Sequence, residues 1–241
     1  MRRLLVLVIW MGCLGMAFGQ SSAFGVKGGL TVGIQQWNNI DQDPLFKYHG
    51  ILFIESYDEE ENLSSVFAQV GYHIKGSALR NTRFNLQNGN IYSLPTKEFQ
   101  FRNISLTLGA KKKFQLGAGS ARHYYLIGIR GDYTVNTNLS DYEDANQVFF
   151  SFLRSDNWVQ KFTYGVTAGG GMEFPFSDYV GGVLEFTVNP DLSRQYRQPP
   201  LTVTDPYNFP NTRNLGERLI NNITLEVTLG IRFLRVVEYI D

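Results

Sequence analysis

The chain has 241 residues, with 22 Lys and Arg against 22 Asp and Glu. Its formal net charge of +0 gives no electrostatic reason to expect a nucleic-acid partner. Aromatic residues make up 14% of the chain and 24 residues are glycine, so the chain can bury apolar surface and is not expected to be disordered. The single cysteine excludes a disulfide framework and a zinc site built from thiolates.

Residues 1–19 have the features of a secretory signal peptide. Arg2 and Arg3 precede an apolar stretch, and Ala17 and Gly19 form a small-residue cleavage pattern. We therefore expect cleavage near Gly19/Gln20 and a mature chain, residues 20–241, that forms a single domain. A membrane helix is the alternative, but the chain turns polar before supplying the about 20 apolar residues that a helical span needs. No comparable apolar run follows, so a later membrane span must be made of strands.

Apolar and polar residues alternate with a period of two in eight segments, which is the pattern of β-strands. The segments are residues 24–35, 46–57, 64–76, 103–110, 127–135, 161–174, 184–189 and 221–233. Short connections at 58–62, 114–122 and 175–179 alternate with longer ones at 38–45, 77–98, 137–160 and 190–218. The pattern predicts an all-β fold: an eight-stranded antiparallel up-and-down transmembrane β-barrel with short periplasmic turns and long extracellular loops.

The apolar face of these strands is predicted to contact lipid, and the polar face to line the lumen. Because eight strands leave an interior that side chains can fill, we expect a lumenal ionic network that plugs the barrel. Its predicted members are Lys27, Glu55, Lys75, Arg130, Asp132, Lys161, Glu173, Glu185, Glu226 and Arg232. A soluble lipocalin-like barrel would have the opposite sidedness, and the period alone does not decide between the two.

Three further features concern the rims of the barrel. Aromatic residues near the strand ends are predicted to form interfacial girdles: Phe24, Trp37, Phe46, Tyr72, Phe99, Tyr133, Phe162, Phe174 and Phe233. Arg102 shares its parity with apolar residues, so it should lie at an interfacial ring or beside a β-bulge. The basic run 111–113 and the acidic run 58–61 are interpreted as solvated rims at the short-turn end.

The long connections are rich in aromatic residues, which form either an interaction surface or a packed layer above the barrel. These residues are Tyr142, Phe149, Phe150, Phe152, Trp158, Tyr196, Tyr207 and Phe209. His49, His73 and His123 lie on separate strands, and no serine completes a catalytic triad with His73 and Glu55. We therefore expect no enzyme activity, no cofactor and no metal site.

After the signal peptide, Phe24-Gly25-Val26-Lys27-Gly28-Gly29-Leu30 resembles the first strand of the PorT-like outer-membrane β-barrels of Bacteroidota. The segments 50–53, 125–128 and 230–233 follow in a similar order. The resemblance implies an eight-stranded outer-membrane barrel without catalytic residues, and some family members are accessory factors of type IX secretion and gliding. Residues 234–241 extend past the end of the last strand as a short periplasmic tail, where such barrels often stop.

Composition, pattern and resemblance together predict a non-enzymatic outer-membrane protein that serves as an anchor or accessory factor. Its expected partners are outer-membrane lipid and secretion-machinery or other envelope proteins, with no nucleic acid. Two alternatives remain open at this point. One is a narrow pore or small-solute-binding outer-membrane barrel, and the other is a soluble periplasmic lipocalin-like barrel that binds a ligand.

Overall fold

The computed structural model describes residues 21–37, 41–57, 63–80, 83–85, 91–93, 96–115, 121–142, 156–204 and 210–237. The predicted signal peptide 1–19 and its cleavage site, the acidic run 58–61 and residues 238–241 of the tail lie outside this part of the chain.

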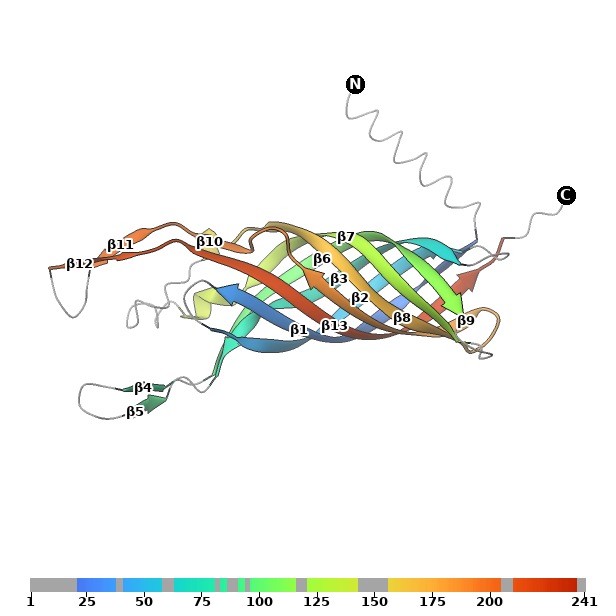
Figure 1. Cartoon of the computed structure of the whole chain (residues 1–241), viewed down its shortest axis with the longest axis horizontal. Helices are drawn as coiled ribbons and strands as arrows, with labels where there is room; N and C mark the ends of the chain where they lie inside the picture. Colours follow the sequence, from blue (N-terminus) through green and yellow to red (C-terminus); the bar gives the residue numbers. More distant parts are fainter. Residues whose placement is uncertain are drawn as a thin grey trace, which may run out of the picture.

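Eight long strands form a closed antiparallel ring (Figure 1). They are β1 (Ser22–Trp37), β2 (Asp43–Ser56), β3 (Ser64–Leu79), β6 (Lys97–Gln115), β7 (Arg122–Thr137), β8 (Phe162–Pro175), β9 (Val180–Pro190) and β13 (Arg218–Arg235). Each long strand pairs with the next long strand in the chain. The ring closes where β1 pairs with β13, from Ser22↔Arg235 to Trp37↔Ile220. The prediction of an eight-stranded up-and-down barrel is confirmed.

Most of the strands are longer than the alternation indicates, and this changes the connections. At the periplasmic end, residues 176–179 connect β8 to β9, and at the extracellular end β2 already begins at Asp43, so the connection from β1 is only residues 38–42. Two connections predicted to be loops contain strands of their own. The first holds β4 (Arg83–Asn85) and β5 (Ile91–Ser93), and the second holds β10 (Tyr196–Gln198), β11 (Leu201–Thr204) and β12 (Thr212–Leu215).

Figure 1 shows both insertions projecting from the extracellular end of the barrel. The β11–β12 hairpin lies farthest from the barrel, and β10 pairs with the first residues of β13, from Tyr196↔Ile220 to Gln198↔Arg218. The third long connection contributes two short 3-10 helices, η1 (Leu139–Tyr142) and η3 (Asp156–Trp158).

The outer face of the ring is apolar. Tyr48, Leu52, Ile129 and Leu229 are 66–78% exposed, whereas most of the residues next to them in each strand are buried. A belt of large apolar side chains around a closed barrel is suited to lipid, because the strands pair around the whole ring and the outward surface is mainly apolar. Within the described residues, no helix has the length and hydropathy to cross a membrane.

Several of the residues predicted to form the girdles lie on the outer face of the barrel, and two do not. Phe24, Phe46, Tyr72, Tyr133 and Phe162 are exposed on the outer face. Trp37 and Phe99 instead pack together in the lumen, with ring centroids 6.2 Å apart. Both residues have lumenal parity, and burial in an apolar cluster outweighs the usual preference of aromatic rings for the interface.

The predicted irregularity at Arg102 is confirmed. The register between β6 and β7 shifts there, from Arg102↔Asn136 to Asn103↔Thr134, so Val135 is the extra residue of a β-bulge. A second local adjustment lies in β3, where Gly76 has a φ of 147° and an added Cβ would lie 1.8 Å from the carbonyl oxygen of Phe99. Only glycine permits this close approach of β3 to β6.

Candidate functional site in the barrel lumen

The lumen is the candidate functional site, and its contents change in layers from one end of the barrel to the other. Strand β3 crosses all of them, because its lumenal residues run from Phe67 near the periplasmic end through His73, Lys75 and Ser77 to Leu79 at the extracellular end.

An apolar cluster, here called the extracellular plug, closes the lumen at the long-loop end. Its buried members come from five segments of the chain: Leu79, Phe99, Phe101, Leu139, Tyr196 and Ile220. Trp37, Trp158 and Val159 pack against it, and the guanidinium of Arg218 lies 5.3 Å from the Trp37 ring. Aromatic and aliphatic burial of this kind excludes water from the extracellular mouth.

Below the plug lies a layer of amides and hydroxyls. Ser77 Oγ donates to Gln35 Oε1 at 2.7 Å, and Gln35 Nε2 donates to Asn222 Oδ1 at 2.9 Å. Across the lumen, Gln195 Nε2 donates to Thr134 Oγ1 at 2.8 Å. These bonds satisfy polar groups that burial would otherwise leave without partners.

The upper ionic layer consists of two cations and two carboxylates. Lys75 Nζ lies 2.8 Å from both Asp132 Oδ2 and Asp191 Oδ1. Arg130 joins the same two carboxylates, at 3.1 Å through Nε and 3.0 Å through Nη2. Sequence reasoning missed Asp191 because it follows Pro190, where strand β9 ends.

A histidine layer comes next. His73 Nδ1 lies 2.7 Å from Glu226 Oε1, and the imidazole rings of His73 and His49 stack with centroids 5.4 Å apart. His49 Nδ1 is 2.8 Å from Thr31 Oγ1, and its Nε2 is 3.0 Å from Thr228 Oγ1. His73 thus pairs with Glu226 rather than with Glu55.

Aromatic rings and ions share the next layer toward the periplasm. Lys27 Nζ lies 2.5 Å from Glu185 Oε1, and Tyr124 Oη donates to Glu185 Oε2 at 2.8 Å. The ammonium of Lys111 lies 4.7 Å from the centroid of the Tyr124 ring. Phe53 and Phe67 also face this ammonium, at 5.5 and 5.6 Å, which is cation–π geometry.

The lowest layer is a periplasmic ionic ring. Glu55 accepts hydrogen bonds from Lys111 Nζ at 2.7 Å and from Lys113 Nζ at 2.5 Å. Glu173 lies 3.2 Å from Lys113 Nζ and is hydrogen-bonded to Arg232. The interpretation of residues 111–113 as a solvated rim is therefore wrong for Lys111 and Lys113, which are buried because β6 continues to Gln115 with the lumenal parity of Asn103 and Ser105.

The structure places nine of the ten predicted network residues in this buried lumen. The exception is Lys161, which is exposed just before the start of β8, so its expected lumenal position is wrong. Among the residues that the structure describes, the buried charges below the plug are Lys27, Lys75, Lys111, Lys113, Arg130 and Arg232 against Glu55, Asp132, Glu173, Glu185, Asp191 and Glu226. Six cations thus face six carboxylates, which is consistent with burial of charges only as partners of each other.

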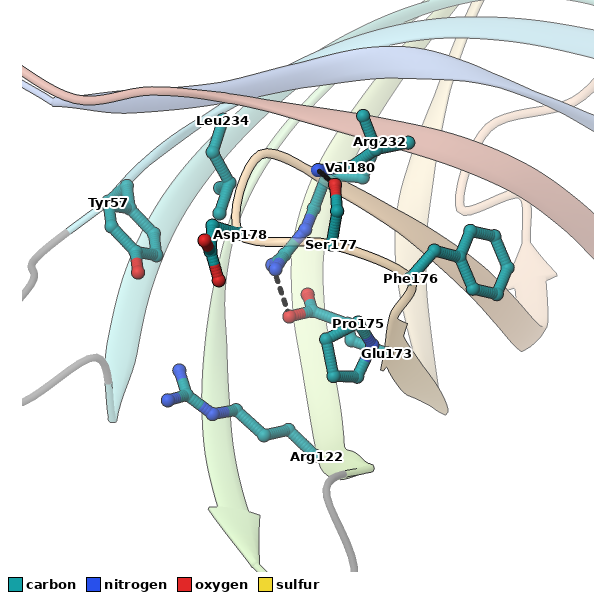
Figure 2. Close-up of a pocket in the computed structure, with 10 residues that line it drawn as sticks. All are labelled: Tyr57, Arg122, Glu173, Pro175, Phe176, Ser177, Asp178, Val180, Arg232 and Leu234. Atoms are coloured by element: carbon teal, nitrogen blue, oxygen red, sulfur yellow. Dashed lines mark hydrogen bonds and ion pairs between the residues drawn. The ribbon is translucent and has the colours of Figure 1, made fainter.

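A pocket of about 330 Å³ lies at the periplasmic mouth, beside the turn at 176–179. Figure 2 shows Arg232 and Glu173 joined in its wall, with Arg122 and Asp178 nearby. Tyr57, which follows β2, and Leu234, near the end of β13, complete the opposite side. The periplasmic mouth is therefore concave and charged.

The predicted aromatic interaction surface divides into three parts. Tyr196 is buried in the extracellular plug, where its ring meets Trp158 edge-on at 6.1 Å, so neither forms an open aromatic patch. Phe149, Phe150, Phe152, Tyr207 and Phe209 lie outside the described residues. Tyr142 ends η1, but its side chain is also outside the described part.

Two ionisable groups near the extracellular rim have shifted pKa values. The pKa of Glu98 is lowered, chiefly because Lys47 donates a hydrogen bond to its carboxylate across 2.7 Å. The pKa of Arg218 is lowered because burial beside the plug disfavours its charged form.

Comparisons with known proteins find similar solved structures but no matching family. No family model matches the chain, and no curated protein sequence matches it. The outer membrane protein OprG of Pseudomonas aeruginosa is similar in structure at 8% identity, over 89% of this chain and 97% of that one, with a TM-score of 0.49. Ail, the attachment invasion locus protein of Yersinia pestis, is 10% identical over 89% and 99%, with a TM-score of 0.43.

A third similar structure is an enzyme. The outer membrane protease OmpT of Escherichia coli is 9% identical over 90% of this chain and 97% of that one, with a TM-score of 0.44. At these identities and scores, the similarities carry no inference about activity, ligand or partner of this chain.

Proposed function

We propose that this protein is a closed, non-enzymatic outer-membrane barrel that acts as an anchor or accessory factor of the cell envelope. The observation that supports this most directly is the filled lumen. Successive layers, from the extracellular plug to the periplasmic ionic ring, occupy it with buried side chains. A barrel of this kind offers its two ends and its outer face to partners, rather than a passage.

The outer face and the two ends have different proposed partners. Outer-membrane lipid is the proposed partner of the apolar belt, because these side chains are exposed on a closed ring of paired strands. Envelope proteins are the proposed partners of the ends, where the β11–β12 hairpin projects on one side and a charged pocket opens on the other.

The finer proposal is that the chain is PorT-like and assists protein secretion or gliding. It rests on the sequence resemblance of the first strand, Phe24 to Leu30. A strain that lacks the protein should release less of its exported protein into the medium, and the intact gene should restore release. Normal release, with the outer membrane otherwise unchanged, would contradict this role.

The two alternatives fit the structure less well. A narrow pore requires a continuous water path, whereas Phe101, Lys75 and Glu55 are each at most 2% exposed at three heights of the lumen. A soluble lipocalin-like barrel requires an apolar interior, whereas here the charges face inward and the apolar residues outward.

Conductance distinguishes the closed barrel from a pore. The purified mature protein should insert into planar lipid bilayers without unitary conductance steps. Reproducible steps from protein that retains heat-resistant folding on gels would contradict the closed lumen. Extraction without detergent into the soluble periplasmic fraction would instead favour the soluble alternative.

A further inference from the structure

The histidine layer contains a set of metal-binding side chains that the sequence does not reveal. His49 comes from β2, His73 from β3 and Glu226 from β13, and one possible ligand atom of each lies within 4.8 Å of the others. All three residues are buried at mid-lumen, between 3% and 6% exposed. Two imidazoles and one carboxylate form the protein ligand set of many zinc sites.

Glu226 differs from the other buried carboxylates of the lumen in its ion-pair partner. Five of the six carboxylates below the plug form an ion pair with a lysine or arginine: Glu55, Asp132, Glu173, Glu185 and Asp191. Within the described residues, the ion pair of Glu226 is to His73, which is charged only when protonated. Lys27 and Arg130, the nearest cations in the adjacent layers, are already bound to other carboxylates. A bound cation would give Glu226 the permanent positive partner that the other five have.

The surroundings of the two imidazoles suit a ligand role. Each ring nitrogen of His49 is within hydrogen-bonding distance of a threonine hydroxyl, Thr31 or Thr228. One nitrogen can therefore bind an ion while the other keeps a hydroxyl partner, which is how metal-bound histidines are usually oriented. Gly71 leaves the space that His73 occupies, because a Cβ there would lie 2.3 Å from His73 Nε2.

We propose that His49, His73 and Glu226 bind one divalent transition-metal ion, with Zn²⁺ as the best fit. In a tetrahedral zinc site the ligand atoms are about 3.3 Å apart. Side-chain rotations that move the ligand atoms by about 1 Å therefore bring the three residues into zinc-binding geometry. Binding displaces the proton shared by His73 and Glu226, and the ion takes its place between them. The ion thereby connects β13 to β2 and β3 across β1, which is the seam where the first and last strands close the ring.

The filled lumen predicts how the ion enters. Plug residues lie above the site, and Lys27, Lys111 and the ionic ring lie below it. An ion is therefore acquired while the barrel folds, and afterwards exchanges slowly. The experiment must compare refolding in the presence of zinc with addition of zinc to the folded barrel.

The test uses the full mature chain without an affinity tag, refolded from urea into detergent with ZnCl₂ or with EDTA and then desalted. Zinc per folded barrel is measured by mass spectrometry of the metal. We expect one zinc per chain after refolding with ZnCl₂, little uptake when zinc is added to the EDTA-refolded barrel, and loss of the bound zinc in His73→Gln and Glu226→Gln. Folded wild type without stoichiometric zinc, or unchanged zinc in both variants, would overturn the proposal.

His123→Gln is the matched control, because His123 lies at the periplasmic end of β7, stacked on Phe114 and away from the site. It should keep one zinc per chain. Thr31→Val leaves all three ligands in place and should weaken zinc binding about 10-fold through loss of the outer hydrogen bond.

A second measurement needs no variant, in case the ligand variants fail to fold. X-ray absorption at the zinc edge of the wild-type protein should show only nitrogen and oxygen ligands, with the multiple scattering of two imidazoles. A spectrum without imidazole scattering would show that the metal binds elsewhere and would overturn the site.

Discussion

The two ends of the lumen are closed by different forces. At the extracellular end, Leu79, Phe101 and Tyr196 pack as an apolar plug, whereas at the periplasmic end Glu55 and Glu173 hold three cations in a ring. Apolar burial is non-directional, while a buried ion pair depends on every partner remaining in place. The extracellular closure therefore depends on packing, whereas the periplasmic closure depends on the charged partners of the ionic ring.

The largest expected effect tests the ionic end. Glu55→Gln removes the carboxylate that Lys111 and Lys113 share, and leaves two buried ammonium groups without it. We expect the free energy of unfolding to fall by about 4 kcal/mol, measured by urea titration in detergent micelles. The control is Glu217→Gln at the exposed Arg197–Glu217 pair, where the loss should stay below about 1 kcal/mol. Similar losses in the two variants would remove the distinction between buried and exposed pairs.

The apolar end is tested by Leu79→Ala, which leaves a cavity in the extracellular plug. The expected loss is about 3 kcal/mol, from lost burial and an unfilled cavity. Ile129→Ala removes a comparable side chain from the lipid-facing surface, where it is 67% exposed, and should cost much less. Equal midpoints in urea titrations of the two variants would show that the plug is not packed as described.

The lumenal layer of aromatic rings and ions, which lies between the two ends, can be tested with two adjacent tyrosines. Tyr124→Phe removes a hydroxyl that donates to the buried Glu185 carboxylate, and should cost about 2 kcal/mol. Tyr125→Phe makes the same change on the outer face, where the ring is 58% exposed, and should leave the unfolding midpoint unchanged. If Tyr125→Phe is the more damaging variant, the assigned inner and outer faces of β7 are reversed.

The smallest effect lies at the extracellular rim. The pKa of Glu98 is lowered in the folded barrel by Lys47, so the pair stabilises the fold above the unfolded pKa of about 4.3, and this contribution is lost as pH falls through the lower folded pKa. Because both side chains are partly exposed, the contribution should be below about 1 kcal/mol. Unfolding midpoints of wild type and Glu98→Gln, followed through this acidic range, should converge as the pH falls. A constant difference would show that the pair contributes nothing by ionisation.

The errors of sequence reasoning lie where strands end. Lys111 and Lys113 have lumenal parity but lie beyond the predicted segment 103–110, and Asp191 follows the proline at which β9 ends. Lys161 has lumenal parity as well, yet it lies at the rim because β8 begins one residue later. Parity assigns a side chain to a face, but only the pairing of neighbouring strands decides how far that face continues.

The sequence by itself determined the eight strands, their alternating faces and the presence of both acidic and basic residues on the inner face. These follow from a two-residue period, which is a local property of the chain. Which charges meet was decided by the tertiary structure, because ring closure sets the height of each residue relative to strands far away in sequence. His49, His73 and Glu226 share one layer only because β13 pairs with β1 in this register, and no local pattern records that closure.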